Sequence, residues 1–202
     1  MSSHHFVKEQ QEPALVILDL QDFSWERLSG LLEWVPTVLV AEEAVDQVLS
    51  WGIKIDVIIS SERFRNENTQ LLEEQYPIRF LVSQSGEHLK EALHYLLASD
   101  HKAAHLIGFS RQDSKQLDEF LDKMDLTLFD EGRKYYPVQG GSFKKWFPAT
   151  TVEIFGPNGL PVQIRNSEMD MILPLEFITQ IELPEGFTEF SAATLIWIGE
   201  EV

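Results

Sequence analysis

Short apolar runs that alternate with amphipathic stretches dominate the first 129 residues of the chain. The runs cover residues 14–20, 37–41, 55–60, 78–83 and 104–109. Each is rich in leucine or β-branched residues and almost continuously apolar, which is typical of strands buried on both faces. Strands that alternate with helices form a mostly parallel sheet with right-handed crossovers. The pattern therefore predicts an α/β fold for this part of the chain.

The stretches between the runs have the periodicity of helices. In residues 42–51 the apolar positions fall on one face, and Gly52 is placed to end the helix. Residues 86–98 and 114–124 show the same spacing of apolar side chains. We therefore expect a helix in each of these three segments.

The pattern changes after Gly132. Turn sequences at 139–142 and 156–159 separate strand-like runs, several of which alternate apolar and polar residues. Such segments predict a small antiparallel sheet or β-sandwich. The runs cover residues 150–155, 160–166, 177–183 and 193–199. We therefore expect two domains, an α/β domain over residues 1–132 and a β-sandwich over 133–202.

Charge and composition exclude several classes of function. The 202 residues include 33 acids and 16 bases, so the formal net charge is −17, and such a surface repels nucleic acids and anionic membranes. The chain has no cysteine, which excludes thiol catalysis and cysteine-ligated metals. No apolar run approaches the roughly 18 residues of a membrane span. We expect a cytoplasmic protein.

A basic strip interrupts the acidic chain. Residues 133–148 carry Arg133, Lys134, Lys144 and Lys145 and no acid, whereas 149–202 hold nine acids and a single arginine. The strip either binds an anion or a partner's acidic surface, or it only keeps a hairpin soluble. Both alternatives stay open at this level.

Common catalytic and metal-binding motifs are absent from the sequence. It contains no Walker loop, no GxGxxG after a strand, no GxSxG and no HExxH. Of the six histidines, His101 and His105 are four residues apart, but they straddle an expected helix–strand boundary and would not share a helix face. No metal site is expected from the sequence.

One stretch of the sequence indicates a particular family. Residues 37–64 resemble the core of the thiamine pyrophosphokinase family. In that family a strand is followed by an Asp-Gly-Ala-type turn and by a helix that ends at Gly-Ile. The sequences Pro-Asp, Ile-Ile and Gly-Asp-Phe-Asp-Ser come next. Segment 85–97 is similar to the family's Thr-Asp-Leu-Glu-Lys-Ala-Leu, and 106–114 is similar to its Gly-rich turn followed by Arg-x-Asp-His. The matching positions are Ala44, Gly52, Ile53, Asp56, Ile58, Ile59, Leu89, Ala92, Leu93, Gly108, Arg111 and Asp113.

The resemblance implies a fold and an activity. It implies that an N-terminal nucleotide-binding domain joins a C-terminal β-sandwich in a homodimer. It also implies transfer of pyrophosphate from ATP to the hydroxyl of thiamine, with magnesium. The positions that would contact the cofactor or phosphates, by this resemblance, are Glu42, Arg63, Lys90, Arg111 and Asp113.

The family's metal-binding carboxylates are largely replaced. In its Gly-Asp-Phe-Asp-Ser motif the two aspartates become Ser61 and Arg63, and Glu62 is the single acid left as a candidate catalytic residue. The segment Thr-Asp-Leu-Glu becomes Glu87, His88, Leu89 and Lys90, and Asp-Gly becomes Glu42 and Glu43. Two unit charges about 4 Å apart interact by about 4 kcal/mol at an effective dielectric constant near 20. An arginine in place of a carboxylate reverses an interaction of that size.

Three hypotheses follow. The first is a non-catalytic homologue, a pseudoenzyme that binds a thiamine-like small molecule or has a structural role. The second is an active or altered transferase that uses Glu42, Glu62 and Asp113 in a rearranged site. The third is an interaction module without a small-molecule ligand. The acids also have structural interpretations, because Glu42 and Glu43 suit the first turn of a helix and Asp113 suits a helix cap.

The C-terminal runs 177–183 and 193–199 carry more large apolar side chains than one inner face needs. We therefore expect a homodimer formed through the β domain. Replacing Trp197 or Ile198 with aspartate is expected to give a monomer or an aggregate.

Overall fold

The computed structural model describes residues 12–21, 23–84 and 86–202. The chain divides into two compact units, Met1–Phe129 and Asp130–Val202. His4 and His5 lie outside the described residues.

The first unit contains a parallel sheet, as the sequence predicts. Its strands are β1 (Ala14–Ile17), β2 (Val38–Ala41), β3 (Val57–Ser60), β4 (Arg79–Val82), β5 (Ala103–Ile107) and β6 (Asp125–Asp130). They lie in the order β4-β3-β2-β1-β5-β6, and every neighbouring pair is parallel. The first three strands are buried at every position, which explains their continuous hydrophobicity.

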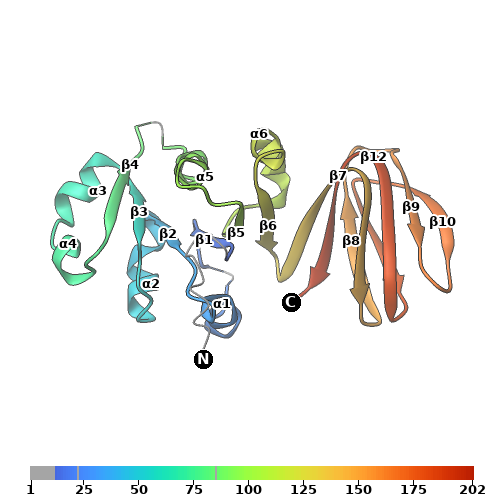
Figure 1. The fold of residues 1–202 in the computed structure, drawn as a ribbon, viewed down its shortest axis with the longest axis horizontal. Helices are drawn as coiled ribbons and strands as arrows, with labels where there is room; N and C mark the ends of the chain where they lie inside the picture. Colours follow the sequence, from blue (N-terminus) through green and yellow to red (C-terminus); the bar gives the residue numbers. More distant parts are fainter. Residues whose placement is uncertain (1–11, 22, 85) are drawn as a thin grey trace, which may run out of the picture. The chain divides into compact units, whose positions relative to one another are not determined.

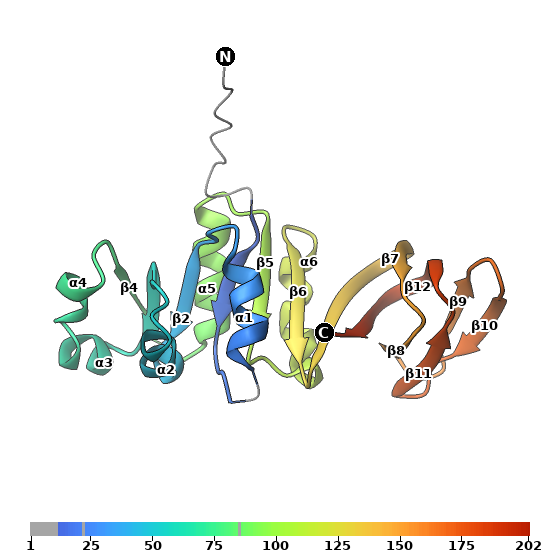
Figure 2. The same ribbon diagram turned by 90° about the horizontal axis from the view of Figure 1, so that it is seen from below.

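Helices cover both faces of this sheet. The α-helices are α1 (Trp25–Leu32), α2 (Val45–Ser50), α3 (Glu62–Glu67), α4 (Leu71–Glu74), α5 (His88–Ala98) and α6 (Asp118–Leu121). Figures 1 and 2 show α1 and α2 on one face of the sheet and α5 and α6 on the opposite face. On the first face, buried side chains of β1, β2 and β3 pack against Leu28 of α1 and Val45 and Val48 of α2.

Two of the expected helices are partly 3-10 turns. The segment predicted over 42–51 begins with η1 (Glu42–Ala44) before α2, and that over 114–124 contains η2 (Arg111–Leu117) before α6. Ser110 caps η2 by accepting a hydrogen bond from the Gln112 N–H at 3.3 Å. The expected cap at Asp113 is therefore wrong, because a serine three residues earlier takes that position.

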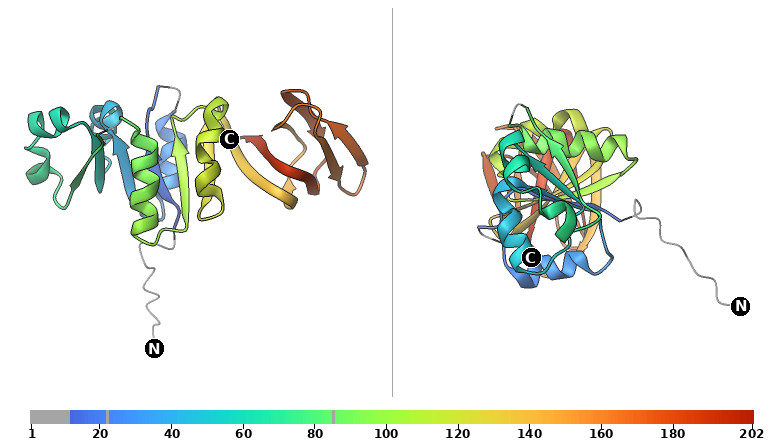
Figure 3. Two further views of the ribbon diagram at one scale, coloured as in Figure 1. Left: turned by 90° about the horizontal axis from the view of Figure 1, so that it is seen from above. Right: turned by 90° about the vertical axis from the view of Figure 1, so that its left-hand side faces the viewer.

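The second unit is antiparallel, as expected. Its strands are β7 (Arg133–Phe147), β8 (Thr150–Phe155), β9 (Pro161–Arg165), β10 (Asp170–Pro174), β11 (Ile178–Leu183) and β12 (Gly186–Glu201). Strand β12 pairs with β7, β8 and β9, and a register shift between Ala192 and Leu195 lets it change partners. Figure 3 shows the long, curved β7 and β12. Their inner faces enclose a core that includes Phe147, Phe190 and Ile198.

Two cations of the basic strip form ion pairs within the second unit. Arg133 pairs with Glu201 at 3.0 Å, and Lys145 pairs with Glu200. Lys144 lies opposite Glu189 in the ladder between β7 and β12. Burial and the hydrogen bond to Glu200 raise the pKa of Tyr136, which packs under Lys145. These contacts favour a structural role for the strip over an anion site.

Trp197 and Ile198 are buried in the single chain. Trp197 stacks on Phe155, with ring centroids 6.0 Å apart. An aspartate at either position would therefore disrupt the core and would not test the expected dimer. No helix among the described residues is long and apolar enough to cross a membrane.

Candidate functional site

The carboxyl ends of the parallel strands bring polar side chains to one edge of the first unit. Glu42 and Glu43 follow the last residue of β2, and Ser61 follows the last residue of β3. Helix α5 begins nearby at His88. Ligands of open α/β sheets bind at this edge of the sheet.

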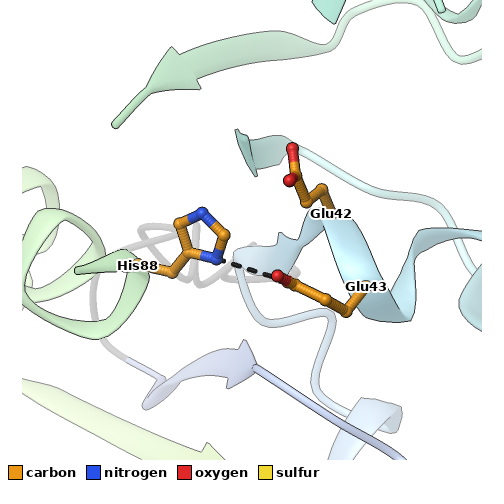
Figure 4. Close-up of side chains that lie close together, drawn as sticks. All are labelled: Glu42, Glu43 and His88. Atoms are coloured by element: carbon orange, nitrogen blue, oxygen red, sulfur yellow. Dashed lines mark ion pairs between the residues drawn. The ribbon is translucent and has the colours of Figure 1, made fainter. Parts of the chain in front are cut away.

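Glu42, Glu43 and His88 converge at this edge (Figure 4). One potential ligand atom from each side chain lies within 4.8 Å of the other two. His88 Nδ1 is 3.3 Å from Glu43 Oε2, and the His88 side chain is only 14% exposed. The three residues, which we call the Glu–Glu–His cluster, come from two segments distant in sequence.

Ser61 fixes the carboxylate of Glu42. Its backbone N–H and its hydroxyl both donate hydrogen bonds to Glu42 Oε2, at 2.7 and 2.8 Å. The same hydroxyl caps α3 by accepting a hydrogen bond from the Phe64 N–H at 3.1 Å. A residue that the family resemblance places at a metal-binding aspartate therefore holds another carboxylate in position.

A pocket of about 290 Å³ adjoins the cluster, and Glu43 and His88 form part of its wall. The remaining lining residues are Leu18, Ala41, Gly86, Glu87, Leu89, Lys90 and Gln116. They come from the end of β2 and from the segments that follow β1, β4 and β5. The volume is just below the range of about 300–1,000 Å³ that is usual for small-molecule sites.

The loops that follow β1 and β5 approach closely beside this pocket. Gly108 has φ +76°, and a Cβ added there would lie 2.3 Å from the backbone N and O of Asp19. Only glycine fits this position without displacing the backbone. Gly108 is one of the positions that match the family's Gly-rich turn.

The cationic residues singled out from the sequence are paired locally. Arg63 is 85% exposed and binds Glu67 at 2.9 Å on its own helix, and this contact raises the pKa of Arg63. Lys90 lines the pocket, but it binds Glu87 at 2.6 Å, which raises the pKa of Lys90. Neither side chain extends a free positive charge into the site.

The remaining predicted residues are dispersed. Glu62 is 73% exposed and pairs with Arg65 at 3.3 Å, because the chain turns into α3 directly after Ser61 and does not continue as a strand. Asp113 is exposed, whereas Arg111 is buried at the start of η2. These three residues do not line the pocket. Of the predicted set, the structure places Glu42 in the cluster and Lys90 on the pocket wall.

Sequence reasoning missed Glu43 and His88 as members of the site. Both carry a signal that could have found them, since Glu43 follows a buried strand and His88 begins the helix after the β4 strand. Their proximity depends on β2, β3 and β4 being neighbours in the sheet. Two carboxylates and one imidazole are a ligand set that can hold a divalent cation.

A parallel α/β unit with a carboxyl-edge site, followed by an antiparallel β unit, defines the fold class. No protein-family profile and no curated protein sequence matches the chain. Solved structures do match, and several of them are structures of thiamine pyrophosphokinases. The enzyme from Bacillus subtilis has a TM-score of 0.70 and 12% sequence identity over 94% of this chain and 99% of its own.

Fungal enzymes are also similar to this chain. Thiamin pyrophosphokinase from Candida albicans has a TM-score of 0.66 and 10% identity, over 98% of this chain and 91% of its own. The yeast enzyme has a TM-score of 0.66 and 8% identity, over 95% and 87%. The chain therefore has the thiamine pyrophosphokinase fold, as the sequence resemblance implies. Identities this low establish the fold alone.

Proposed function

We propose that the protein is a non-catalytic relative of thiamine pyrophosphokinase that binds a small molecule at the carboxyl edge of its parallel sheet. The observation that carries this proposal is the local pairing of Arg63 with Glu67 and of Lys90 with Glu87. Both cations lie at positions where the family resemblance implies metal-binding acids. At each position the site therefore has a cation in place of a carboxylate.

Pyrophosphate transfer from ATP depends on metal ions, which are held by carboxylates and neutralise the phosphates. Here the Glu–Glu–His cluster holds two acids, Glu42 and Glu43, and one oxygen of Glu42 is already hydrogen-bonded to Ser61. His88 occupies a further position that the resemblance gives to an aspartate. This ligand set supports binding of a small molecule better than it supports magnesium–ATP chemistry.

An altered transferase that uses Glu42, Glu62 and Asp113 is less consistent with the geometry. Glu62 pairs with Arg65 on the outside of α3, and Asp113 is exposed in η2. A catalytic set would have to gather around one substrate, and none of these three acids lines the 290 Å³ pocket.

A homodimer is a further part of this proposal. Phe187 and Trp146 are opposite each other on β12 and β7, and they are 62% and 47% exposed. Exposed large aromatic side chains side by side are typical of interfaces. This pair also suits the alternative in which the chain acts mainly as an interaction module.

Calorimetry and a product assay test the proposed function. We expect no magnesium-dependent affinity for ATP tighter than about 1 mM, which corresponds to about −4 kcal/mol, and no AMP from ATP and thiamine. Micromolar, magnesium-dependent binding of ATP or formation of AMP would contradict the proposal. Separate titrations with thiamine and thiamine diphosphate test the small-molecule part, and the absence of binding to both would favour the interaction module.

A further inference from the structure

We infer that Glu42, Glu43 and His88 form a binding site for a divalent transition-metal ion of the zinc class. This inference goes beyond the proposed function and does not depend on it. It reverses the sequence-based expectation that the chain has no metal site, because the fold brings together residues whose spacing in the sequence shows no metal-ligand pattern.

The distances within the Glu–Glu–His cluster suit one ion. Two ligand atoms that are each about 2.1 Å from zinc at a tetrahedral angle lie about 3.4 Å apart. His88 Nδ1 and Glu43 Oε2 are 3.3 Å apart. One ligand atom of Glu42 lies within 4.8 Å of a ligand atom of each of the other two residues, so binding of one ion requires the Glu42 carboxylate to move closer to this pair.

The type of ligand indicates the type of metal. Magnesium prefers oxygen ligands and retains several waters, whereas imidazole suits zinc, copper, nickel and iron. His88 supplies that imidazole, and its side chain is largely shielded from solvent. The site should therefore discriminate against magnesium.

The surroundings of the cluster resemble a supported metal site. Ligating carboxylates usually receive hydrogen bonds from outside the first coordination shell, and Glu42 Oε2 receives two from Ser61. Within the described part of the chain, the other carboxylate oxygen of Glu42 makes no hydrogen bond. That oxygen is available to an ion.

The pocket gives the ion access to a further ligand. Three protein ligands leave at least one position open on a tetrahedral ion. Glu43 and His88 belong to the wall of the 290 Å³ pocket, so the open position faces a space that holds water or a small molecule. A metal here would be accessible and exchangeable.

Zinc titration of the full chain tests the inference. Because the adjacent His4 and His5 could bind metal by themselves, every protein in the test carries His4→Ala and His5→Ala. We expect calorimetry with zinc chloride to show about one ion per chain. His88→Ala and Glu43→Gln should each weaken zinc binding by at least about 10-fold.

His94→Ala is the matched control, because His94 lies on the same helix and is exposed. It should bind zinc like the parent. Cobalt chloride provides a second readout, since binding at a low-coordinate protein site should intensify the visible absorption of cobalt, and His88→Ala should abolish this increase. Magnesium at millimolar concentration should not displace zinc.

The inference is overturned if the parent binds no zinc, or if His88→Ala and His94→Ala bind it equally well. Circular dichroism must show that each variant is folded, and Glu43→Gln, at an exposed position, gives an answer even if His88→Ala is unstable. Magnesium–ATP binding would contradict the proposed function and leave the zinc result unaffected. The two failures are therefore distinguishable.

Discussion

Glu42 and Ser61 join the ends of two neighbouring parallel strands through a single carboxylate oxygen, which accepts hydrogen bonds from both the backbone N–H and the hydroxyl of Ser61. The hydroxyl also caps α3. One serine thus orients an acid of the Glu–Glu–His cluster and begins a helix.

Ser61→Ala should therefore have two effects. Loss of the cap should lower the free energy of unfolding by about 1 kcal/mol, and loss of the hydroxyl donor to Glu42 should weaken zinc binding by about 10-fold. Denaturant unfolding and zinc calorimetry measure the two effects. Ser61→Thr keeps the hydroxyl and should restore both; if it does not, the hydroxyl is not the cause.

Gly108→Ala should destabilise the first unit strongly. The new Cβ would overlap the backbone of Asp19, at a positive φ that costs L-residues energy by itself, so we expect a loss of about 3 kcal/mol or more. Gly30→Ala is the matched control, since Gly30 is on α1 with nothing within 4 Å of an added Cβ. It should stabilise the helix by up to about 1 kcal/mol. Equal effects of the two substitutions in thermal unfolding would contradict the close approach.

Phe187→Asp tests the homodimer without disturbing the core. We expect the wild-type protein to be a dimer in light scattering and the variant to be a monomer, because a buried aspartate at an interface is costly. Trp34→Asp replaces another exposed aromatic residue, in the first unit, and should leave the dimer intact. A monomeric wild-type protein at tens of micromolar would refute the expectation.

Because of Lys134, the free energy of unfolding should change with pH in the alkaline range. Burial and the nearby Lys145 lower the pKa of Lys134, although Glu200 opposes the shift. The folded protein therefore releases this proton at a lower pH than the unfolded chain, and the folded state gains stability as pH rises from the lowered pKa towards about 10.5. Denaturant midpoints of wild type and Lys134→Met, measured over alkaline pH up to about 10.5, should show that the stability of wild type rises relative to that of the variant. A difference that stays constant with pH would contradict this assignment.

Hydrophobic patterning predicted five of the six strands of the first unit, and it was clearest for β1, β2 and β3, which are buried throughout. Strand β6 was not predicted, although it lies beside β5 in the same sheet. In the second unit, alternation predicted antiparallel strands, but the turn expected at 139–142 is wrong because this segment lies inside β7, and β10 was not predicted. The partners of β12 depend on its register shift near Ala192, which no local pattern encodes.

The site was harder to predict for a geometric reason. Alignment with the family's motif drew attention to Glu62 and Arg63, but α3 starts immediately after Ser61 and carries both side chains outward. His88 and Glu43 are distant in sequence, and they meet because the strands that precede them lie in one sheet with β3 between them. Such a pair becomes visible only when strand order is known.

The position of β12 has a consequence for synthesis of the chain. This strand pairs with β7, β8 and β9. These three strands therefore cannot complete their pairing until residues 186–201 have left the ribosome. The first unit is complete in sequence at Phe129 and can fold earlier, since domains generally fold as units during translation. Until β12 is synthesised, β7, β8 and β9 each lack this partner, and unpaired strand edges promote aggregation.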